Sequence, residues 1–303
     1  MLRKLVNYRK WWYLISVLLV IPGTIALATL GLKLGIDFTG GSLLELQVPA
    51  GADSDEVREA AEGPFGDPIV QETSDDTFQI RVSELNPEEH NRLLAQIEGR
   101  LGEGTEELRF ESVGPAISRD LRNKAILSVG LGSLLILMYI AYAFRNVPKP
   151  ASSWRFGATT IVTLLHDVLF TLGVFALLGK FAGVAVDINF VAALLTVIGY
   201  SVHDTIVVFD RIRENLVKRI GGSFPETVNY SIAQSLVRSI NTSVTVLLVL
   251  FALYFFGGES LQGFVLALLI GTAIGTYSSI FNAAPLLVTW QRWSDKRAAK
   301  RNA

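Results

Sequence analysis

The sequence contains no cysteine, so disulfide and thiol chemistry are unavailable to this protein. It also lacks the ligand spacing of zinc sites and the signature of a phosphate-binding loop. No nucleophile stands with a base in a recognisable catalytic motif. We therefore expect neither an enzyme nor a bound metal or cofactor, and the absence of cysteine leaves the cellular compartment open.

Lysine is missing between Lys33 and Lys124, and this gap marks a segregation of charge that the net charge of −1 conceals. Residues 34–122 contain 20 acidic residues and 7 arginines, which is the composition of a soluble acidic domain. The remainder is apolar, so that half of all residues are hydrophobic and the mean hydropathy is +0.40. Such a composition is typical of a membrane protein rather than of an ordinary soluble one.

Several apolar runs are long enough to cross a bilayer, whose hydrocarbon core of ~30 Å needs about 20 helical residues. We predict six transmembrane helices, over residues 11–34, 124–144, 156–178, 188–209, 240–256 and 264–290. A capping-box pattern at residues 223–226 predicts an amphipathic cytoplasmic segment that bends into the fifth span.

Lysine and arginine gather in every second connection between these spans, which predicts that both termini are cytoplasmic. Residues 34–122 then lie outside the cytoplasm, after residues 1–33 with the first span and before residues 123–303 with the other five. A cleaved signal peptide is the alternative for the N-terminus, because Ala26-Leu27-Ala28 could be a cleavage site. The apolar run is longer than the usual ~7–15 residues of such a peptide, which favours an uncut anchor.

The outer segment alternates between strand and helix patterns. Strands are predicted over residues 43–48, 68–72, 77–82 and 107–113, and helices over residues 54–61 and 87–101. This βαββαβ order predicts a ferredoxin-like α+β domain. His90 is the single histidine here, and we expect it on a solvated helix face. The segment reads as a contact module rather than an enzyme.

Ionisable residues inside a membrane span are costly and therefore indicate function. The fourth span contains His203 and Asp204, and the fifth carries Arg238 and Thr242 at a matching depth. We expect Arg238 to pair with Asp204 and keep it ionised, and we favour proton or ion coupling over a structural salt bridge.

Two further features of the spans have a structural alternative. His166 and Asp167 lie near the middle of the third span, and for His166 structure and function remain equally open. Gly271-x-x-x-Gly275 in the sixth span is typical of close helix packing. Asp210, at the membrane edge, is expected to form an interfacial ion pair with Arg211 or Arg213.

Several motifs resemble the SecD/SecF family over nearly the whole chain. The motif Asp37-Phe38-Thr39-Gly40-Gly41 follows the first span, and Gly114-Pro115 precedes the second. His166-Asp167, the stretch 198–215 around Asp204 and the stretch 238–243 are also similar to the family pattern. One departure is His203, where the family more often has asparagine, and this could place a second titrating group beside Asp204.

The resemblance implies a role in bacterial protein export. Family members pair with SecD in an arrangement similar to transporters of the RND type, and they assist the SecYEG channel, with YajC and YidC as further partners. They would use the proton-motive force across the inner membrane to promote export of unfolded polypeptides. The resemblance makes Asp204, Arg238 and Thr242 proton-pathway residues, with His203, His166 and Asp167 as further candidates. No nucleic-acid partner is expected.

Two rival functions remain open at this point. One is half of an RND-like proton-coupled exporter of small or lipidic molecules, which would need a second set of spans. The other is a scaffold that stabilises a translocon without transporting anything, for which Asp204 would be replaceable.

Overall fold

The computed structural model describes residues 2–49, 51–74, 76–102, 104–145, 147–148 and 152–302. It divides into two compact units, one formed by Met1–Lys33 with Ser128–Ala303, and the other by Leu34–Leu127. We call the first the span unit and the second the outer unit. Each has its own hydrophobic core, so each is described by itself.

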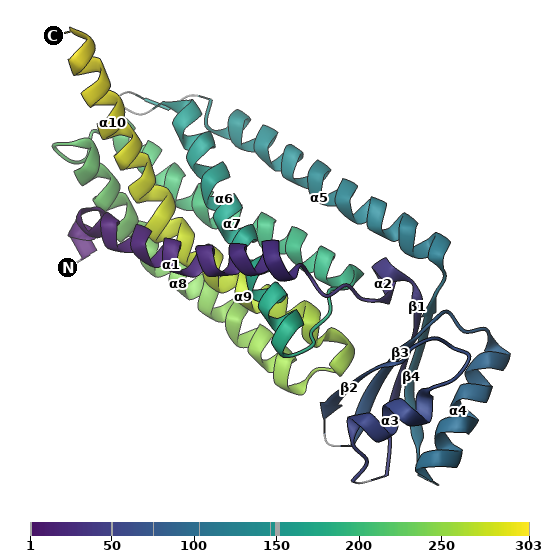
Figure 1. Cartoon of the computed structure of the whole chain (residues 1–303). Coiled ribbons are helices and arrows are strands. Elements are labelled where there is room, and N and C mark those ends of the chain that lie inside the picture. Colours follow the sequence, from purple (N-terminus) through teal and green to yellow (C-terminus); the bar gives the residue numbers. More distant parts are fainter. Residues whose placement is uncertain are drawn as a thin grey trace. The chain divides into compact units, whose positions relative to one another are not determined.

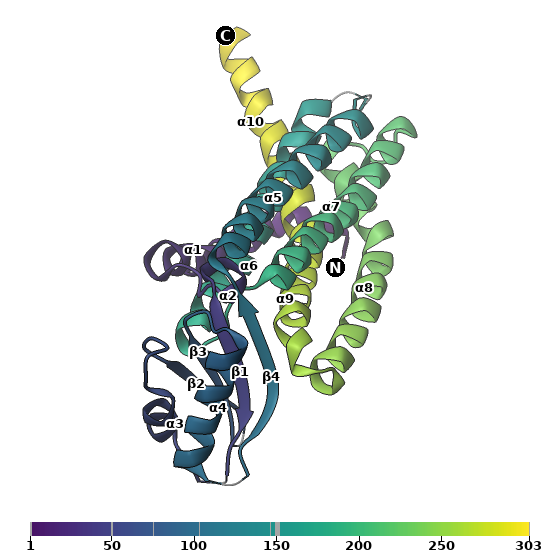
Figure 2. The ribbon, with the colours of Figure 1, turned by 90° about the vertical axis from the view of Figure 1, so that its right-hand side faces the viewer.

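The outer unit is a four-stranded antiparallel sheet with two helices on one face (Figures 1 and 2). Along the chain come β1 (Gly41–Gln47), α3 (Ser54–Ala61), β2 (Ile69–Ser74), β3 (Thr77–Val82), α4 (Pro87–Leu101) and β4 (Glu106–Val113). The order in the sheet is β2-β3-β1-β4, so that β1 pairs with both β3 and β4. Each predicted strand and helix of this segment is present within a few residues.

The alternation of side chains in β1 and β3 explains which face the helices cover. Successive residues of a strand point to opposite faces, and the apolar set points toward the helices. That set is fully buried together with residues of α4: Leu44, Leu46, Phe78, Ile80, Leu93 and Ile97. Both helices begin with a capping box, formed by Asp53 with Glu56 and by Asn86 with Glu89.

His90 does not lie on a solvated face, so this expectation was wrong. Its side chain is 15% exposed, and its Nε2 lies 3.1 Å from Oε1 of Glu107. The imidazole stacks on Phe110, with ring centroids 4.0 Å apart. The reason is that α4 packs over the sheet beside β4, which brings His90 to the strand that carries both partners.

The motif that follows the first span forms a short helix, α2 (Ile36–Thr39), and a pair of glycines. Gly40 and Gly41 have φ angles of 78° and 113°, in the region that favours glycine. A Cβ atom on Gly41 would lie 2.6 Å from the carbonyl oxygen of Val82. The chain therefore needs glycine here to enter β1 against β3.

Within the described residues, six helical segments are long and apolar enough to cross a membrane, so the protein is a multi-pass membrane protein. They comprise η1 (Leu2–Tyr8) with α1 (Arg9–Leu30), α5 (Pro115–Ala143), α6 (Ser153–Phe181), α7 (Ile188–Val217), α8 (Phe224–Phe256) and the sequence α9 (Gln262–Ser278), η3 (Ser279–Ala283) and α10 (Ala284–Asn302). A short η2 (Glu259–Leu261) precedes α9.

Two of these segments differ from the expectation. α8 is one continuous helix, so the predicted amphipathic segment is its first part and no separate element precedes the span. The sixth segment contains a π-helical turn, η3, between α9 and α10. Such wide turns inside α-helices are rare and frequently lie at functional sites.

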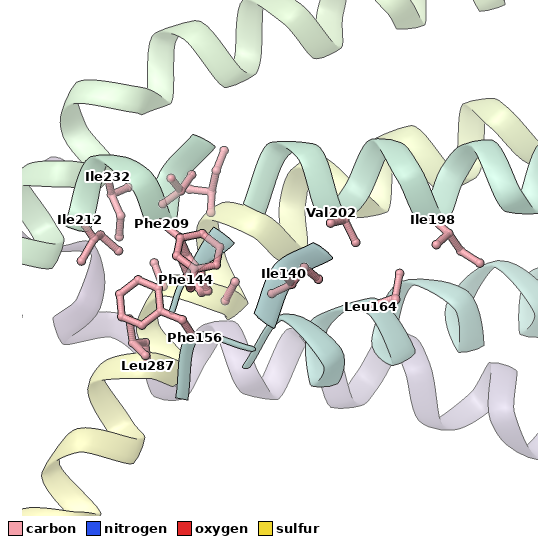
Figure 3. Close-up of a cluster of buried hydrophobic side chains, with 14 of the residues drawn as sticks. Ile140, Phe144, Phe156, Leu164, Ile198, Val202, Phe209, Ile212, Ile232 and Leu287 are labelled. Carbon is pink, nitrogen blue, oxygen red and sulfur yellow. The ribbon is translucent and has the colours of Figure 1, made fainter. Parts of the chain in front are cut away.

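The span unit is held together by aromatic clusters and by close backbone approaches. Phe144, Phe156 and Phe209 pack against one another with ring centroids 4.9–5.9 Å apart (Figure 3). α1 and α6 meet at two glycines, where a Cβ atom on Gly173 would lie 2.4 Å from Cα of Gly23. Bulkier residues at such a crossing would push the helices apart.

Candidate functional site

Polar side chains line the inner faces of α6, α7, α8 and the segment α9–η3. The buried polar residues on these faces are Thr159, Thr160, Thr163, Asp167, Thr171, Ser201, Asp204, Thr205, Asn215, Ser231, Ser235, Ser239, Ser243, Thr272, Ser278, Ser279 and Asn282. Many of the hydroxyls donate to a carbonyl one turn earlier in their own helix, as serine and threonine often do in helices. The remainder connect the helices to one another, with α7 in the centre.

Asp204 lies on the buried side of α7 and is 7% exposed. Its Oδ1 accepts a hydrogen bond of 2.7 Å from the hydroxyl of Ser239 on α8. Its Oδ2 has no hydrogen-bond partner among the described residues. A carboxylate oxygen buried without a partner is costly, and such an atom is a natural place for a proton or a second donor to bind.

Arg238 does not form the expected ion pair with Asp204 anywhere in the described part of the chain. Ser239, the next residue, provides the contact instead. Successive residues of an α-helix point about 100° apart. Ser239 therefore faces α7, whereas Arg238 lies on the exposed side of α8. The two helices do meet at the expected depth, but through the neighbouring side chain.

His203, Arg238 and Thr242 are all exposed on the surface of the span unit. Arg238 lines a groove of about 330 Å³ together with Asp210, Arg211 and Arg213. Of the six predicted proton-pathway residues, His203, Arg238 and Thr242 are thus exposed on α7 and α8. The other three, Asp204, Asp167 and His166, lie inside the bundle.

Contacts between the polar stripes of α7 and α8 continue on both sides of Asp204. The amide nitrogen of Asn215 donates to Ser231 Oγ at 2.8 Å and to Gln234 Oε1 at 2.9 Å. The hydroxyl of Tyr200 donates to Ser243 Oγ at 2.9 Å. Arg213 pairs with Asp210 at 2.9 Å, which confirms the predicted ion pair between these residues.

Asp167 is completely buried where α6, α7 and α9 meet. Its Oδ1 lies 2.8 Å from Nδ1 of His166. Its Oδ2 accepts hydrogen bonds from Ser278 Oγ, at 2.7 Å, and from Ser201 Oγ. Two hydroxyl donors and an imidazole nitrogen thus surround a carboxyl group that has no access to water, and such a network rigidifies the helix contacts.

His166 connects this carboxylate to α1. Its Nε2 lies 3.3 Å from the amide nitrogen of Asn282 in the π-helical turn η3. The amide nitrogen of Asn282 also lies 2.6 Å from Ser16 Oγ on α1. In the same turn, Ser279 shares a 2.8 Å hydrogen bond with Thr205 of α7. The wide turn therefore presents side chains both to α1 and α6 and to α7.

The glycines of the sixth segment lie against α7. A Cβ atom on Gly271 would lie 2.1 Å from a methyl carbon of Val197, and one on Gly275 would lie 3.1 Å from Cβ of Ser201. α9 therefore approaches α7 closely at the level of Ser201, which donates to Asp167.

The signature residues at the two ends of the outer unit come together. Gly41 stands opposite Val113 in the pairing of β1 with β4. A Cβ atom on Gly40 would lie 3.4 Å from the carbonyl oxygen of Val113 and 3.7 Å from Cα of Pro115. Phe38 is buried, Thr39 bonds to the carbonyl of Gly35 at 3.0 Å, and Gly114 precedes α5. These residues form one joint, and Asp37 lies in the first turn of α2.

Ser239 and Ser201 were not singled out by the sequence, although each donates to a buried aspartate. Ser278 stands out in the sequence as a polar residue of the sixth span, but its contact with Asp167 was not predicted. Serine in a membrane helix is common, so the residue type does not mark these contacts. The usable signal is the spacing of these serines, three or four residues from polar neighbours on the same face.

The buried side chains of the site are groups that can hold a proton and pass it on. Within the described residues there is no group of three or more metal-ligating side chains that could hold a metal ion. The site instead consists of two buried carboxylates, a histidine and a set of hydroxyls that link them across helices. Such intramembrane groups are typical of proton relays in pumps and transporters.

Comparison with known proteins shows consistent similarity. Residues 95–293 match the family model "Protein export membrane protein SecD/SecF, C-terminal", and residues 25–48 match the "SecD/SecF GG Motif". The chain is 50% identical over 300 residues to a protein translocase subunit SecF from Thermobaculum terrenum, covering 95% of this chain and 93% of that protein. A SecF subunit from Escherichia coli O157:H7 is 36% identical, with coverage of 94% and 87%.

Among solved structures, SecDF from Thermus thermophilus, described as a translocon-associated membrane protein, is similar with a TM-score of 0.83 and 34% identity. The match covers 95% of this chain but only 38% of the solved chain. SecDF in its super-membrane-facing form gives a TM-score of 0.68 at 33% identity and covers 98% and 40% of the two chains.

Proposed function

Because the chain belongs to the SecD/SecF family, as a SecF subunit of the Sec protein translocase, we propose that it uses the proton-motive force to promote protein export. In this proposal the polypeptide passes through SecYEG, and Asp204 is the group that takes up and releases the proton. The observation that carries the proposal is the buried carboxylate of Asp204, with one oxygen bonded to Ser239 and the other without a partner.

The exposed polar face of α7 and α8 supports a second membrane subunit as the direct partner. His203, Arg238 and Thr242 would be unfavourable against lipid, so another set of helices should cover them. The solved SecDF chain, of which this chain spans 38%, contains enough additional sequence to provide that set. We assign this partner to SecD, and Arg238 then lies between Asp204 and the partner's helices.

The energy available is sufficient for a modest conformational change. One elementary charge that crosses a potential of ~100 mV releases about 2.3 kcal/mol. A shift of this size changes the ratio of two conformations roughly fiftyfold. Protonation of Asp204 would alter its bond to Ser239 and thus the contact between α7 and α8. Thr242, one turn after Arg238 on α8, would move with it.

The outer unit is proposed to contact the exported polypeptide. Its strand and helix order and its 2-3-1-4 sheet support a ferredoxin-like domain. The distribution of lysine and arginine supports cytoplasmic termini in the bacterial inner membrane and an outer unit on the other side. YajC and YidC are further proposed partners.

The test is an export assay in membrane vesicles depleted of the natural subunit, with and without a proton gradient. Wild type and Asp204→Asn are compared at equal levels of complex with SecD. Asp204→Asn keeps the size of the side chain but removes the titrating group. We expect gradient-stimulated export to disappear in this variant, while export driven without the gradient continues.

Asp210→Asn is the matched control. It removes a carboxylate from the same helix, but one that is exposed and paired with Arg213. We expect it to respond to the gradient like wild type. If Asp204→Asn also responds like wild type, the buried carboxylate is structural and the chain acts as a scaffold. If Asp204→Asn fails to assemble with SecD, a structural role is again indicated.

A further inference from the structure

The hydrogen-bonded chain between α1 and Asp167 has a direction that the structure allows to be worked out. It begins at the hydroxyl of Tyr277, which donates to the backbone carbonyl of Trp12 at 2.9 Å. A carbonyl can only accept, so the single hydroxyl hydrogen of Tyr277 is used there. Ser16 Oγ lies 3.2 Å from the Tyr277 oxygen, and any hydrogen shared by that pair must therefore come from Ser16.

The direction propagates through Asn282. Ser16 Oγ contacts both amide atoms of Asn282: Nδ2 donates to it at 2.6 Å, and the Ser16 hydroxyl, which also lies near Tyr277, donates to Oδ1 at 2.9 Å. The second hydrogen of the same amide nitrogen then points to His166 Nε2, at 3.3 Å. Nε2 is thus the acceptor, and the proton of a neutral imidazole is on Nδ1, facing Asp167 Oδ1 at 2.8 Å.

We propose that Asn282 is a positioning residue that holds His166 in its Nδ1–H tautomer, so that His166 and Asp167 form a second proton-holding couple beside Asp204. A proton that binds to Nε2 creates a new N–H bond directed at the amide N–H of Asn282. The hydrogen bond between these atoms must then break, and the amide must turn to present its oxygen. Turning the amide also exchanges its nitrogen for its oxygen at Ser16, so proton uptake at His166 rearranges this hydrogen bond between η3 and α1.

The surroundings of His166 leave few other groups that could set its tautomer. On its own helix the titratable neighbour is Asp167, and on α9 it is Tyr277, with ring centroids 6.4 Å apart. On α1, Tyr13 bonds to Thr289, and on α7, Asp204 bonds to Ser239. No lysine or arginine of the described residues bonds to this set. The π-helical turn is what places Asn282 between Ser16 and His166.

The experiment is nitrogen NMR of the full chain in lipid bilayers, with ¹⁵N-labelled histidine. The chain has 3 histidines, so His166→Gln assigns the signals of interest by their loss. In wild type at neutral pH we expect Nδ1–H. In Asn282→Leu we expect the ratio of Nδ1–H to Nε2–H to fall about fivefold or more, because one hydrogen bond is lost. Asn282→Asp, which offers only an acceptor, should invert the preference.

Thr289→Val is the control, because it removes a different hydrogen bond between α1 and the last helical segment. We expect it to leave the tautomer of His166 unchanged. An Nε2–H form in wild type, or an equal change in Thr289→Val and Asn282→Leu, would overturn the proposal. If Asn282→Leu does not assemble, Ser16→Ala decides the question, since the loss of the Ser16 contact should weaken the Nδ1–H preference.

The proton-holding role rests on the proposed proton-driven function, but the NMR measurement needs no gradient. If the tautomer of His166 changes with substitution of Asn282 but export does not respond to the gradient, the proposed function is wrong and the positioning role stands. If export responds to the gradient but the tautomer does not change, the positioning role is wrong and the proposed function stands.

Discussion

The outer unit and the span unit bury different kinds of side chain. In the outer unit the core consists of leucine, isoleucine, valine, alanine and phenylalanine, and the buried polar groups are few. In the span unit, serines, threonines and two aspartates are as deeply buried as the aromatic rings. Within one chain, therefore, the polar residues lie mostly on the surface of one unit and in the interior of the other.

The difference follows from the solvent of each unit. Water drives apolar side chains of the outer unit into its core. Lipid chains are as apolar as leucine, so helices inside a membrane gain little from burying apolar surface and associate through close packing and hydrogen bonds instead. In the span unit, helices associate through glycine contacts such as Gly23–Gly173 and through hydroxyl contacts such as Ser239–Asp204.

The largest effect is expected from Phe78→Ala. Phe78 is completely buried in the outer core, and such a deletion typically costs about 3–5 kcal/mol. Hydrogen exchange of the strand peptides in the full-length protein should show loss of protection in residues 34–127 while the spans stay protected. Gln79→Ala, on the other face of β3, is the control. Equal loss in both units would show that they do not fold independently.

The next largest effect is expected from Gly173→Ala. The new methyl group would meet the backbone of Gly23, which cannot move aside as a flexible side chain can. Overpacking of this kind costs about 1–3 kcal/mol. Thermal unfolding in detergent measures the loss. Gly157→Ala, in the same helix, has no atom near its new methyl group and should unfold like wild type. The same stability for both variants would mean that α1 and α6 tolerate separation.

Ser239→Ala tests the polar side of the comparison. It leaves Asp204 Oδ1 without its donor, and the expected destabilisation is about 1 kcal/mol, as for other buried hydrogen bonds in membranes. Ser235→Ala is the control, since Ser235 bonds only to backbone carbonyls of its own helix. Reversible unfolding in SDS–detergent mixtures compares the two. A larger loss in Ser235→Ala would contradict the assignment.

The smallest effect is expected at Ser223, one of two helix N-cap residues to be compared. Asn86 caps α4 with two hydrogen bonds, and Asn86→Ala should cost about 1 kcal/mol in the outer unit. Ser223 stands at the same position of α8 but makes no side-chain cap bond, so Ser223→Ala should change stability by less than about 0.5 kcal/mol. Hydrogen exchange at the first turns of both helices measures each value. A clear loss at Ser223 would show a cap that forms in solution.

The elements of both units were largely predictable because hydrophobic periodicity decides them. Alternation in 77–82 and the capping pattern at Asn86 predicted β3 and α4, and apolar runs predicted all six spans. Partner choice was harder to predict. Whether Arg238 or Ser239 meets Asp204 depends on a rotation of about 100° between neighbours, which composition does not report. The π-helical turn that carries Asn282 has no sequence signal, and the contacts of His90 depend on how α4 packs over the sheet.

The joint between Gly40–Gly41 and Gly114–Pro115 makes the outer unit an exchangeable module. Because Gly41 and Val113 are opposite each other in a strand pair, the chain enters and leaves the unit at points about 5 Å apart. Domains whose ends lie this close can be inserted or removed without disturbing their host. A short turn in place of residues 41–113 would therefore close the gap between the first two spans, and a foreign domain with adjacent ends could be grafted at the same position.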